Sequence, residues 1–271
     1  MCSVFSVHRS GYYAWLKKEP GPQKRANAEL DEKLVECYSF HKRRYGAPRL
    51  TMDLREKGLS CSKNRVARRM RFLGISAHSK RKFKAMRYSP HNLPVAPNRL
   101  NRDFTATAPN QKYAGDITYI ATEEGWLYLA VVMDLYSRAI IGWSMQPTMT
   151  QQLVGDALLM ALSKRKLPKN VIFHSDRGSQ YCAHNFQSLL SKYQCISSMS
   201  RKGNCWDNSV VESFFHTLKV ELVYTERYET RAEAKASIFN YVETYYNSVR
   251  RHSYTQYLAP FQFEELLKRI G

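Results

Sequence analysis

The amino-acid sequence predicts an α/β protein in which a mixed sheet flanked by helices follows a small all-helical domain. Up to about residue 75, apolar residues recur at helical spacing. Between residues 113 and 145, three segments are instead rich in Tyr, Ile and Val, as strands are. A helical stripe and a short apolar run follow at 150–175, an alternation typical of a sheet with crossover helices. A length of 271 residues, 44% of them hydrophobic, suffices for both parts.

The first region, residues 1–75, is expected to form three short helices at 27–40, 48–57 and 62–73. In the third, Val66 and Met70 can face inward. Basic side chains then cover the rest of its surface: Lys63, Arg65, Arg68, Arg69 and Arg71. A helix of this kind suits contact with phosphates in a helix-turn-helix-like DNA-binding domain, although a merely solvated basic helix gives the same pattern.

Positive charge is concentrated in one part of the chain. The net charge is +19, and residues 41–87 hold sixteen Lys or Arg against two acidic residues. Such a surface releases counterions from a polyanion, so DNA or RNA is the favoured partner over an acidic membrane. Residues 76–110 lose periodicity and carry several prolines, which indicates a basic, extended linker. No apolar stretch approaches the roughly 18 residues of a membrane span, so we expect a cytoplasmic, nucleoid-associated protein.

The second region, residues 111–271, opens with three strands expected at 113–122, 125–135 and 139–145. Short turns separate them, so they should pair antiparallel. A helix over 150–166 then leads by crossover to a strand at 171–175, which should run parallel to the first strand. Further helices are expected at 183–192 and 209–223.

Two acidic residues stand where this sheet would carry chemistry. Asp176 follows the strand at 171–175, and Gly178 permits a tight turn just beyond it. Asp116 interrupts the first strand, where an acid is disfavoured unless it is exposed or functional. If the two strands are neighbours, the carboxylates meet, and a divalent cation is the simplest way to keep both ionised. Asp176 as a mere turn cap remains the alternative.

A third carboxylate, Glu212, lies near the start of the helix expected from residue 209 and would complete an oxygen-ligand site. Glu212 and Lys219 share one polar helix face, which suits a metal and a phosphate. The competing explanation is a capping box that begins at Ser209, in which Glu212 would only bond back to the helix start.

Two other kinds of site are less well supported. His174, Ser175 and Asp176 are adjacent in one strand, so they cannot converge as a Ser-His-Asp triad. The six cysteines include no CxxC pair, and we interpret them as free thiols. A zinc set remains possible only on paper, from Cys182, His184, Cys195 and Cys205.

Several motifs in order closely resemble the integrase-core transposases of bacterial insertion sequences, and in particular the product of the second reading frame of a two-frame element. The likeness covers nearly the whole chain. In the first region it rests on RRYGAPRL at 43–50 and KNRVARRMRFLGI at 63–75. In the second it rests on DITYI at 116–120, AVVMDLYSRAIIGWSM at 130–145, HSDRGSQY at 174–181, SRKGNCWDNSVVESFFHTLKVE at 200–221 and YNSVRRHSYTQYLAPFQFE at 246–264.

The resemblance implies a ribonuclease-H-like core whose acidic triad is Asp116, Asp176 and Glu212, with Lys219 in the position of a lysine that contacts transposon-end DNA. Two Mg²⁺ ions, with Mn²⁺ as a substitute, would be held by the triad for cleavage and strand transfer. Arg177, Arg201 and Lys202 are further candidates for phosphate contacts. Asp134 also matches the family text, and we interpret it as structural. Tyr113 stands where members usually carry Trp, and we expect it to keep the stacking role.

The implied partners are transposon-end DNA, target DNA and the first-frame product, joined as a fusion, with at least a homodimer on DNA. The chain could instead be a DNA-binding but catalytically weak fragment or a regulator that needs this fusion. A tyrosine recombinase is a more distant alternative, since RRHSYTQY at 250–257 offers the residue types of that site. The strands predicted over 113–145 argue against the helical catalytic domain that such enzymes need.

Overall fold

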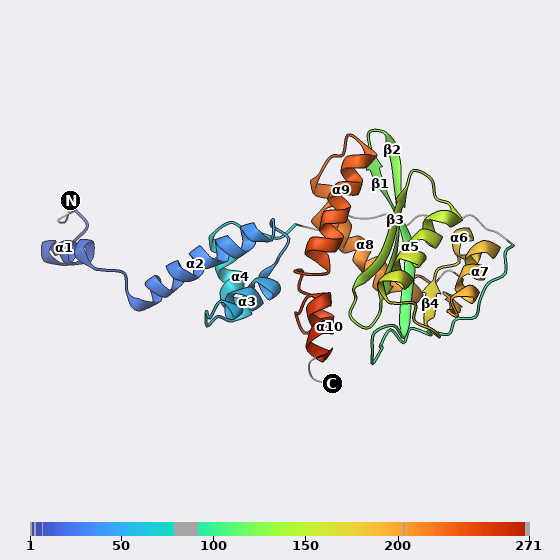
Figure 1. Cartoon of the computed structure of the whole chain (residues 1–271). Coiled ribbons are helices and arrows are strands. Elements are labelled where there is room, and N and C mark those ends of the chain that lie inside the picture. The colour runs from blue at the N-terminus through green and yellow to red at the C-terminus, as the bar shows by residue number, and fades with distance from the viewer. Residues whose placement is uncertain (1, 3, 7, 79–91, 203, 269–271) are drawn as a thin grey trace. The chain divides into compact units, whose positions relative to one another are not determined.

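The computed structural model describes every residue except 1, 3, 7, 79–91, 203 and 269–271. The chain divides into two compact units, Met1–His78 and Ser79–Gly271. Figure 1 labels their helices and strands.

The first unit is helical, as the sequence predicts. It contains α1 (Arg9–Lys17), α2 (Pro22–Phe40), α3 (Ala47–Glu56) and α4 (Lys63–Phe72). The last three correspond to the expected helices, and α2 begins earlier than expected because a proline is favoured in the first turn. Ser62 caps α4 by accepting a hydrogen bond from the Arg65 backbone N–H. Apolar side chains of these three helices are buried together: Leu30, Leu34, Leu50, Leu54, Val66 and Met70.

The second unit is built on a sheet of strand order β3-β2-β1-β4-β5. The strands are β1 (Lys112–Thr122), β2 (Gly125–Asp134), β3 (Ile140–Gln146), β4 (Ile172–Ser175) and β5 (Ile196–Met199). The first three pair antiparallel, while β4 runs parallel to both β1 and β5. The expected mixed α/β fold is therefore confirmed, with β5 as an additional edge strand that the sequence analysis missed.

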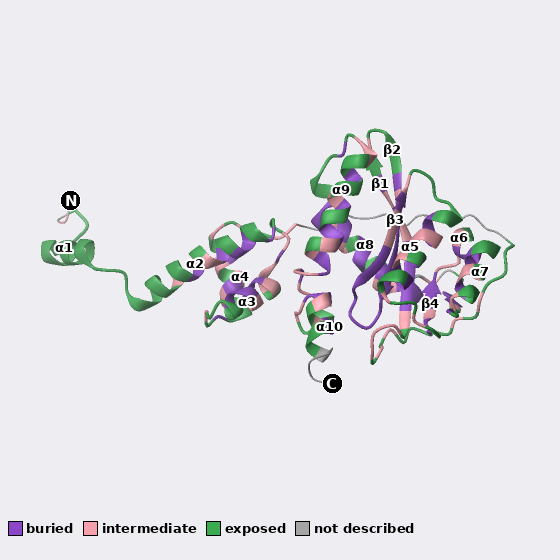
Figure 2. Cartoon of the chain, in the orientation of Figure 1, coloured by how far each residue is buried: buried purple, intermediate pink, exposed green. Residues whose placement is uncertain are grey.

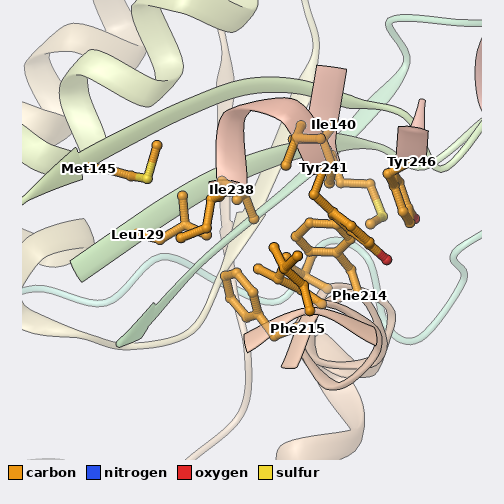
Figure 3. Close-up of a cluster of buried hydrophobic side chains, with 14 of the residues drawn as sticks. Leu129, Ile140, Met145, Phe214, Phe215, Ile238, Tyr241 and Tyr246 are labelled. Atoms are coloured by element: carbon orange, nitrogen blue, oxygen red, sulfur yellow. The ribbon is translucent and has the colours of Figure 1, made fainter. Parts of the chain in front are cut away.

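Helices cover both faces of this sheet (Figure 1). One face carries α5 (Gln151–Lys164), α6 (Ser179–Cys182) and α7 (His184–Lys192). The other carries α8 (Ser209–Glu221), α9 (Arg231–Phe239) and the π-helical stretch Asn240–Tyr246. Figure 3 shows aromatic side chains of this second layer, among them Phe214 and Tyr241, beside Leu129 and Ile140 of the sheet. The chain closes with α10 (Pro260–Lys268).

Part of the expected linker belongs to the second unit. Residues 79–91 lie outside the described part of the chain, but residues 92–102, which we call the strap, lie against the sheet edge. The Arg99 N–H donates to Ser198 Oγ at 2.9 Å, and the Ala96 N–H donates to Met199 Sδ at 3.4 Å. Leu100 is buried in the core. Figure 2, in which buried residues are purple, shows that much of the sheet is buried. The strap thus runs along the edge strand β5, which the sequence analysis did not foresee. Residues 92–102 of the expected linker at 76–110 are therefore part of the second unit.

Within the described residues, we find no helix that combines the length and the apolar character needed to cross a membrane.

Candidate active site

The register of β1 and β4 brings two acidic residues to the same level of the sheet. Ala114 pairs with His174, so Asp116 and Asp176 each lie two residues beyond that pair. β4 ends at Ser175, whereas β1 continues to Thr122. Asp176 therefore leaves the sheet beside the strand position that holds Asp116, the neighbourhood that the sequence predicts.

Asp116 is a buried acid in an unfavourable electrostatic environment. Its side chain accepts a hydrogen bond from the Ile117 N–H at 2.8 Å, and the residue is only 7% exposed. Burial raises the pKa of Asp116 well above its ordinary value, and the negative charge of Asp176 raises it further. Glu212 adds a smaller contribution in the same direction, and Lys219 opposes it. These four side chains therefore form one electrostatically linked group.

We expect Asp116→Asn to stabilise the metal-free chain, and to do so more at high pH than at low pH. The unfolded carboxyl ionises above about pH 4, whereas the folded one keeps its proton to a higher pH, so wild-type stability falls as the pH rises between those values. An amide of the same size removes that cost and raises the free energy of unfolding by about 1 kcal/mol at pH 8. Urea denaturation at pH 5 and pH 8 in EDTA measures the difference. An equal effect at both pH values would contradict this account.

Asp176 lies at the turn between β4 and α6. Its Oδ1 accepts a hydrogen bond from the Gly178 N–H at 2.8 Å, and a Cβ added at Gly178 would lie 3.0 Å from the same oxygen. The residue is half-buried. Asp176 therefore does serve the turn, as the alternative reading allows, while its charge also acts on Asp116.

Glu212 occupies the first turn of α8 and is exposed to solvent. The capping box of the competing explanation is absent, because α8 has Asn208 rather than Ser209 at its N-cap and no side-chain hydrogen bond there. Although the residue is exposed, part of its carboxyl group loses solvent against the neighbouring protein, which raises the pKa of Glu212, and the charge of Asp176 adds to the shift. The capping explanation for Glu212 is thus not supported, and its electrostatic partner is Asp176.

The donor chemistry of this group fits a hard divalent cation, since Mg²⁺ prefers carboxylate oxygens. Across the described residues, however, no three His, Cys, Asp or Glu side chains stand close enough to enclose a metal ion. The acids interact through their charges without forming a closed ligand shell.

Lys219 lies two turns beyond Glu212 on α8 and is buried, with 7% of its surface exposed. Its Nζ lies 4.6 Å from the centre of the Tyr119 ring, a cation–π distance. Burial lowers the pKa of Lys219, and the charge of Asp116 counteracts this shift. A cation is therefore held beside the acidic group, and its contact with phosphate stays a prediction.

Several arginines predicted to contact DNA already have protein partners. In the second unit, Arg177 Nε donates to the Ser200 carbonyl at 2.6 Å, and Arg201 forms an ion pair with Asp207 at 2.8 Å. Lys202 is exposed. These bonds give Arg177 and Arg201 a role in holding the chain around the site, which the sequence analysis did not anticipate.

The first unit gives a similar result. Arg65 donates to Asn27 Oδ1 at 2.9 Å, and Arg69 forms an ion pair with Asp31. Both arginines tie α4 to α2, while Lys63 and Arg68 of the same helix are exposed. Two of the five basic residues singled out on α4, Arg65 and Arg69, thus hold the domain together.

Tyr113 does not occupy a stacking position at the site. It is fully buried in the core and its hydroxyl donates to Asn110 Oδ1 at 2.7 Å.

The structural interpretation of Asp134 fits its surroundings. This buried carboxylate accepts hydrogen bonds from the Asn110 and Tyr136 N–H groups and lies 3.6 Å from Arg165.

The two distant alternatives find no support. Cys182 and Cys195 are buried free thiols, and the Cys205 side chain lies outside the described part of the structure. Arg250, which the tyrosine-recombinase reading needs at the site, is instead buried against Glu221 at 2.7 Å.

Asp207 is the buried polar residue near the site that sequence reasoning missed. Asp207 is fully buried and accepts hydrogen bonds from Arg201, Arg102 and Asn98. The sequence offered one clue, because Asp207 lies directly before the helix that carries Glu212 and six residues after Arg201.

Comparison with known proteins agrees with this picture. Two family models described as integrase core domain match residues 106–205 and 212–266, and a model described as HTH-like domain matches residues 24–83.

Among curated proteins, the chain is 50% identical over 266 residues to the transposase InsF for insertion sequence IS3A of Escherichia coli strain K12, covering 97% of this chain and 92% of that protein. It is 44% identical over 265 residues to an uncharacterized 31 kDa protein of insertion element IS600 from Shigella sonnei, covering 98% and 97%.

Among solved structures, it is similar to a chain of the simian T-cell lymphotropic virus intasome with a PP2A regulatory subunit, at 16% identity and a TM-score of 0.49 over 85% of this chain and 74% of that one. The HTLV-2 integrase catalytic core domain in complex with magnesium matches at 19% identity and a TM-score of 0.43, over 58% and 98%. From the 50% identity to InsF over 97% of the chain and the matching domain models, we conclude that the chain belongs to the IS3-type family of insertion-sequence transposases with an integrase core domain.

Proposed function

We propose that the chain cleaves the DNA ends of its insertion sequence and joins them to a new site, with Asp116, Asp176 and Glu212 as the catalytic acids of a two-metal mechanism. One observation carries the proposal. A buried aspartate on β1 is kept electrostatically unfavourable by a second acid at the end of the neighbouring strand. Two neighbouring acids destabilise the metal-free fold. A bound cation would offset their repulsion, so such a pair is typical of a metal site.

The three acids would hold magnesium, and manganese could substitute for it. When bound, the two ions would supply activation of a water or a DNA 3′-hydroxyl for in-line attack on a phosphodiester, and stabilisation of the leaving oxygen. Asp116 lies on β1 and Asp176 directly follows the adjacent strand β4, so the two provide the fixed part of the site. Glu212 lies in the first turn of α8 with its side chain exposed, so rotation of that side chain toward Asp176 would complete the ligand set.

The cationic side chains have separate tasks in this proposal. Lys219, buried beside Asp116, would bind a phosphate next to the scissile one. The exposed Lys63 and Arg68 of α4 would contact the backbone of transposon-end DNA through the helix-turn-helix-like unit. Because two ends must be joined, at least two protomers would assemble on DNA.

A second candidate function is that of a DNA-binding fragment or regulator which becomes active only when fused to the first-frame product. It is favoured by α1, none of whose residues is buried although it carries Tyr12, Tyr13 and Trp15. An exposed aromatic surface of this kind suits contact with a further protein segment.

The test compares the 271-residue chain alone with a version fused to the first-frame product, each incubated with labelled DNA of the element's ends. We expect strand cleavage and joining in Mg²⁺ or Mn²⁺, none in EDTA, and none with Asp176→Asn. Activity in the fused version alone would select the second candidate for the separate chain. Cleavage in EDTA, or by Asp176→Asn, would contradict the proposed site.

A further inference from the structure

Asp207 gathers an unusual number of hydrogen-bond donors. Arg201 donates to its carboxylate through the backbone N–H at 2.9 Å, through Nε at 2.9 Å and through a terminal nitrogen at 2.8 Å. Arg102 Nε and Asn98 Nδ2 each add a bond of 3.0 Å. The carboxylate is fully buried, so both of its oxygens are used for contacts within the protein.

These bonds join segments that are distant in the sequence. Asn98 and Arg102 belong to the strap, whereas Arg201 lies at the start of the loop that follows β5. Asp207 itself lies in the 3-10 helix Cys205–Asn208, which runs directly into α8. Its neighbour Asn208 donates from Nδ2 to the Gly115 carbonyl at 3.4 Å, next to Asp116. The strap, the loop and β1 therefore meet at the residue before the helix of Glu212.

The start of α8 depends on these outside contacts. The helix has no side-chain hydrogen bond at its N-cap, so its first turn lacks the usual local anchor. Glu212 lies in that turn, five residues after Asp207. A helix is stiff over such a distance, so whatever fixes residues 207 and 208 also fixes the direction in which Glu212 leaves the helix.

We propose that Asp207 is a positioning residue, which clamps the strap to the start of α8 and so sets the place of Glu212 relative to Asp116 and Asp176. This inference rests on the proposed function of the three acids. Asp207 does not itself contact DNA or metal in this role. Its bond with Arg201 keeps its pKa below the ordinary value, so the clamp stays charged throughout the working pH range.

Asp207→Asn tests the clamp with a side chain of the same size. It keeps one oxygen acceptor but loses the charge and the second acceptor oxygen, so the paired bonds of Arg201 cannot all form. We expect the Mg²⁺ concentration for half-maximal cleavage to rise about 10-fold or more, as for other partners that orient metal ligands. Binding of end DNA should change little, and Mn²⁺ should restore part of the rate.

Asp134→Asn is the matched control. Asp134 is also a fully buried, arginine-paired carboxylate of the second unit, but it lies at the end of β2 and its contacts do not reach α8. We expect this variant to lose stability without a change in the Mg²⁺ dependence. Arg102→Gln removes a single bond from the clamp and should raise the Mg²⁺ concentration for half-maximal cleavage by a smaller factor than Asp207→Asn. This milder variant tests the clamp even if Asp207→Asn fails to fold.

Hydrogen exchange supplies a readout that needs neither metal nor activity. In the metal-free full chain, the amides of residues 209–213 should lose protection in Asp207→Asn or Arg102→Gln and keep it in Asp134→Asn. The positioning role is overturned if both clamp variants keep wild-type Mg²⁺ dependence, or if protection falls equally in the control. If the wild type itself cleaves without metal, the proposed function is wrong. The hydrogen-exchange result would still show whether Asp207 holds the start of α8 in place.

Discussion

Asp176→Asn and Glu212→Gln will each reduce the rate of end cleavage by about 10³-fold or more, in Mg²⁺ and in Mn²⁺, while binding of end DNA persists. Each change removes an anionic oxygen donor and leaves a side chain of the same size. The physical reason lies in the arrangement of the charges, because Asp176 acts on both Asp116 and Glu212. Loss of one member disables the group, since a metal site with a missing ligand cannot hold the reacting oxygen atoms in line.

The double variant gives the sharper result. If the acids act as a unit, Asp176→Asn combined with Glu212→Gln will lose no more activity than the worse single variant, to within about 10-fold. Additive losses would indicate separate roles. Asp156→Asn is the control, because this acid lies on α5 and bonds to Gln146 and Gln152. Single-turnover cleavage at saturating DNA measures the chemical step, and an electrophoretic shift measures binding.

A second outcome would also contradict the site. If Glu212→Gln retained wild-type cleavage while Asp176→Asn lost it, the exposed helix start would have no part in the chemistry. The acidic pair of the two strands would then need a different third ligand. Among the described residues, no alternative set of three His, Cys, Asp or Glu side chains is close enough to enclose a metal ion.

The sequence predicted the parts of the site that depend on local pattern. The β-prone residues of 113–122 and the short apolar run at 171–175 identified β1 and β4. The parallel pairing of those strands follows from the crossover between them, so the closeness of Asp116 and Asp176 could be foreseen. The position of Glu212 on α8 followed from helical periodicity. These inferences need only the order of elements and the handedness of their connection.

The parts that failed depend on long-range contacts. β5 is four residues long and has two serines, Ser197 and Ser198, at its centre, so its pattern is too weak to mark a strand, and it is held by pairing with β4. The role of Asp207 rests on Asn98 and Arg102, about a hundred residues earlier in the chain. The arginines on α4 could not be divided into DNA-facing and structural residues without knowing that Asn27 and Asp31 of α2 lie beside them.

The largest effect on stability is expected at a buried ion pair behind the site. Arg250 donates to both carboxylate oxygens of Glu221, at 2.8 and 2.7 Å, and the Tyr241 hydroxyl donates to the same group at 2.8 Å. Both charged side chains are almost fully buried. Glu221 ends α8, so this pair fastens the far end of the helix that carries Glu212 and Lys219.

Arg250→Met should lower the free energy of unfolding by about 3–5 kcal/mol, because it leaves the Glu221 carboxylate buried without its cation. Arg250→Lys should recover only part of the loss, since one ammonium group cannot reproduce the paired geometry. The double change Arg250→Met with Glu221→Leu should recover most of it, because the cost comes from the stranded charge rather than from the missing bonds. Urea denaturation measures all three.

The exposed pair of Arg227 and Glu123, 2.9 Å apart, is the matched control, and Arg227→Met should change stability little because water screens both charges. Equal losses for the buried and the exposed arginine would contradict the role of desolvation. A double variant as unstable as Arg250→Met alone would instead mean that the bidentate bonds themselves hold α8 in place. In that case the double variant should also lose cleavage, because Glu212 and Lys219 depend on the same helix.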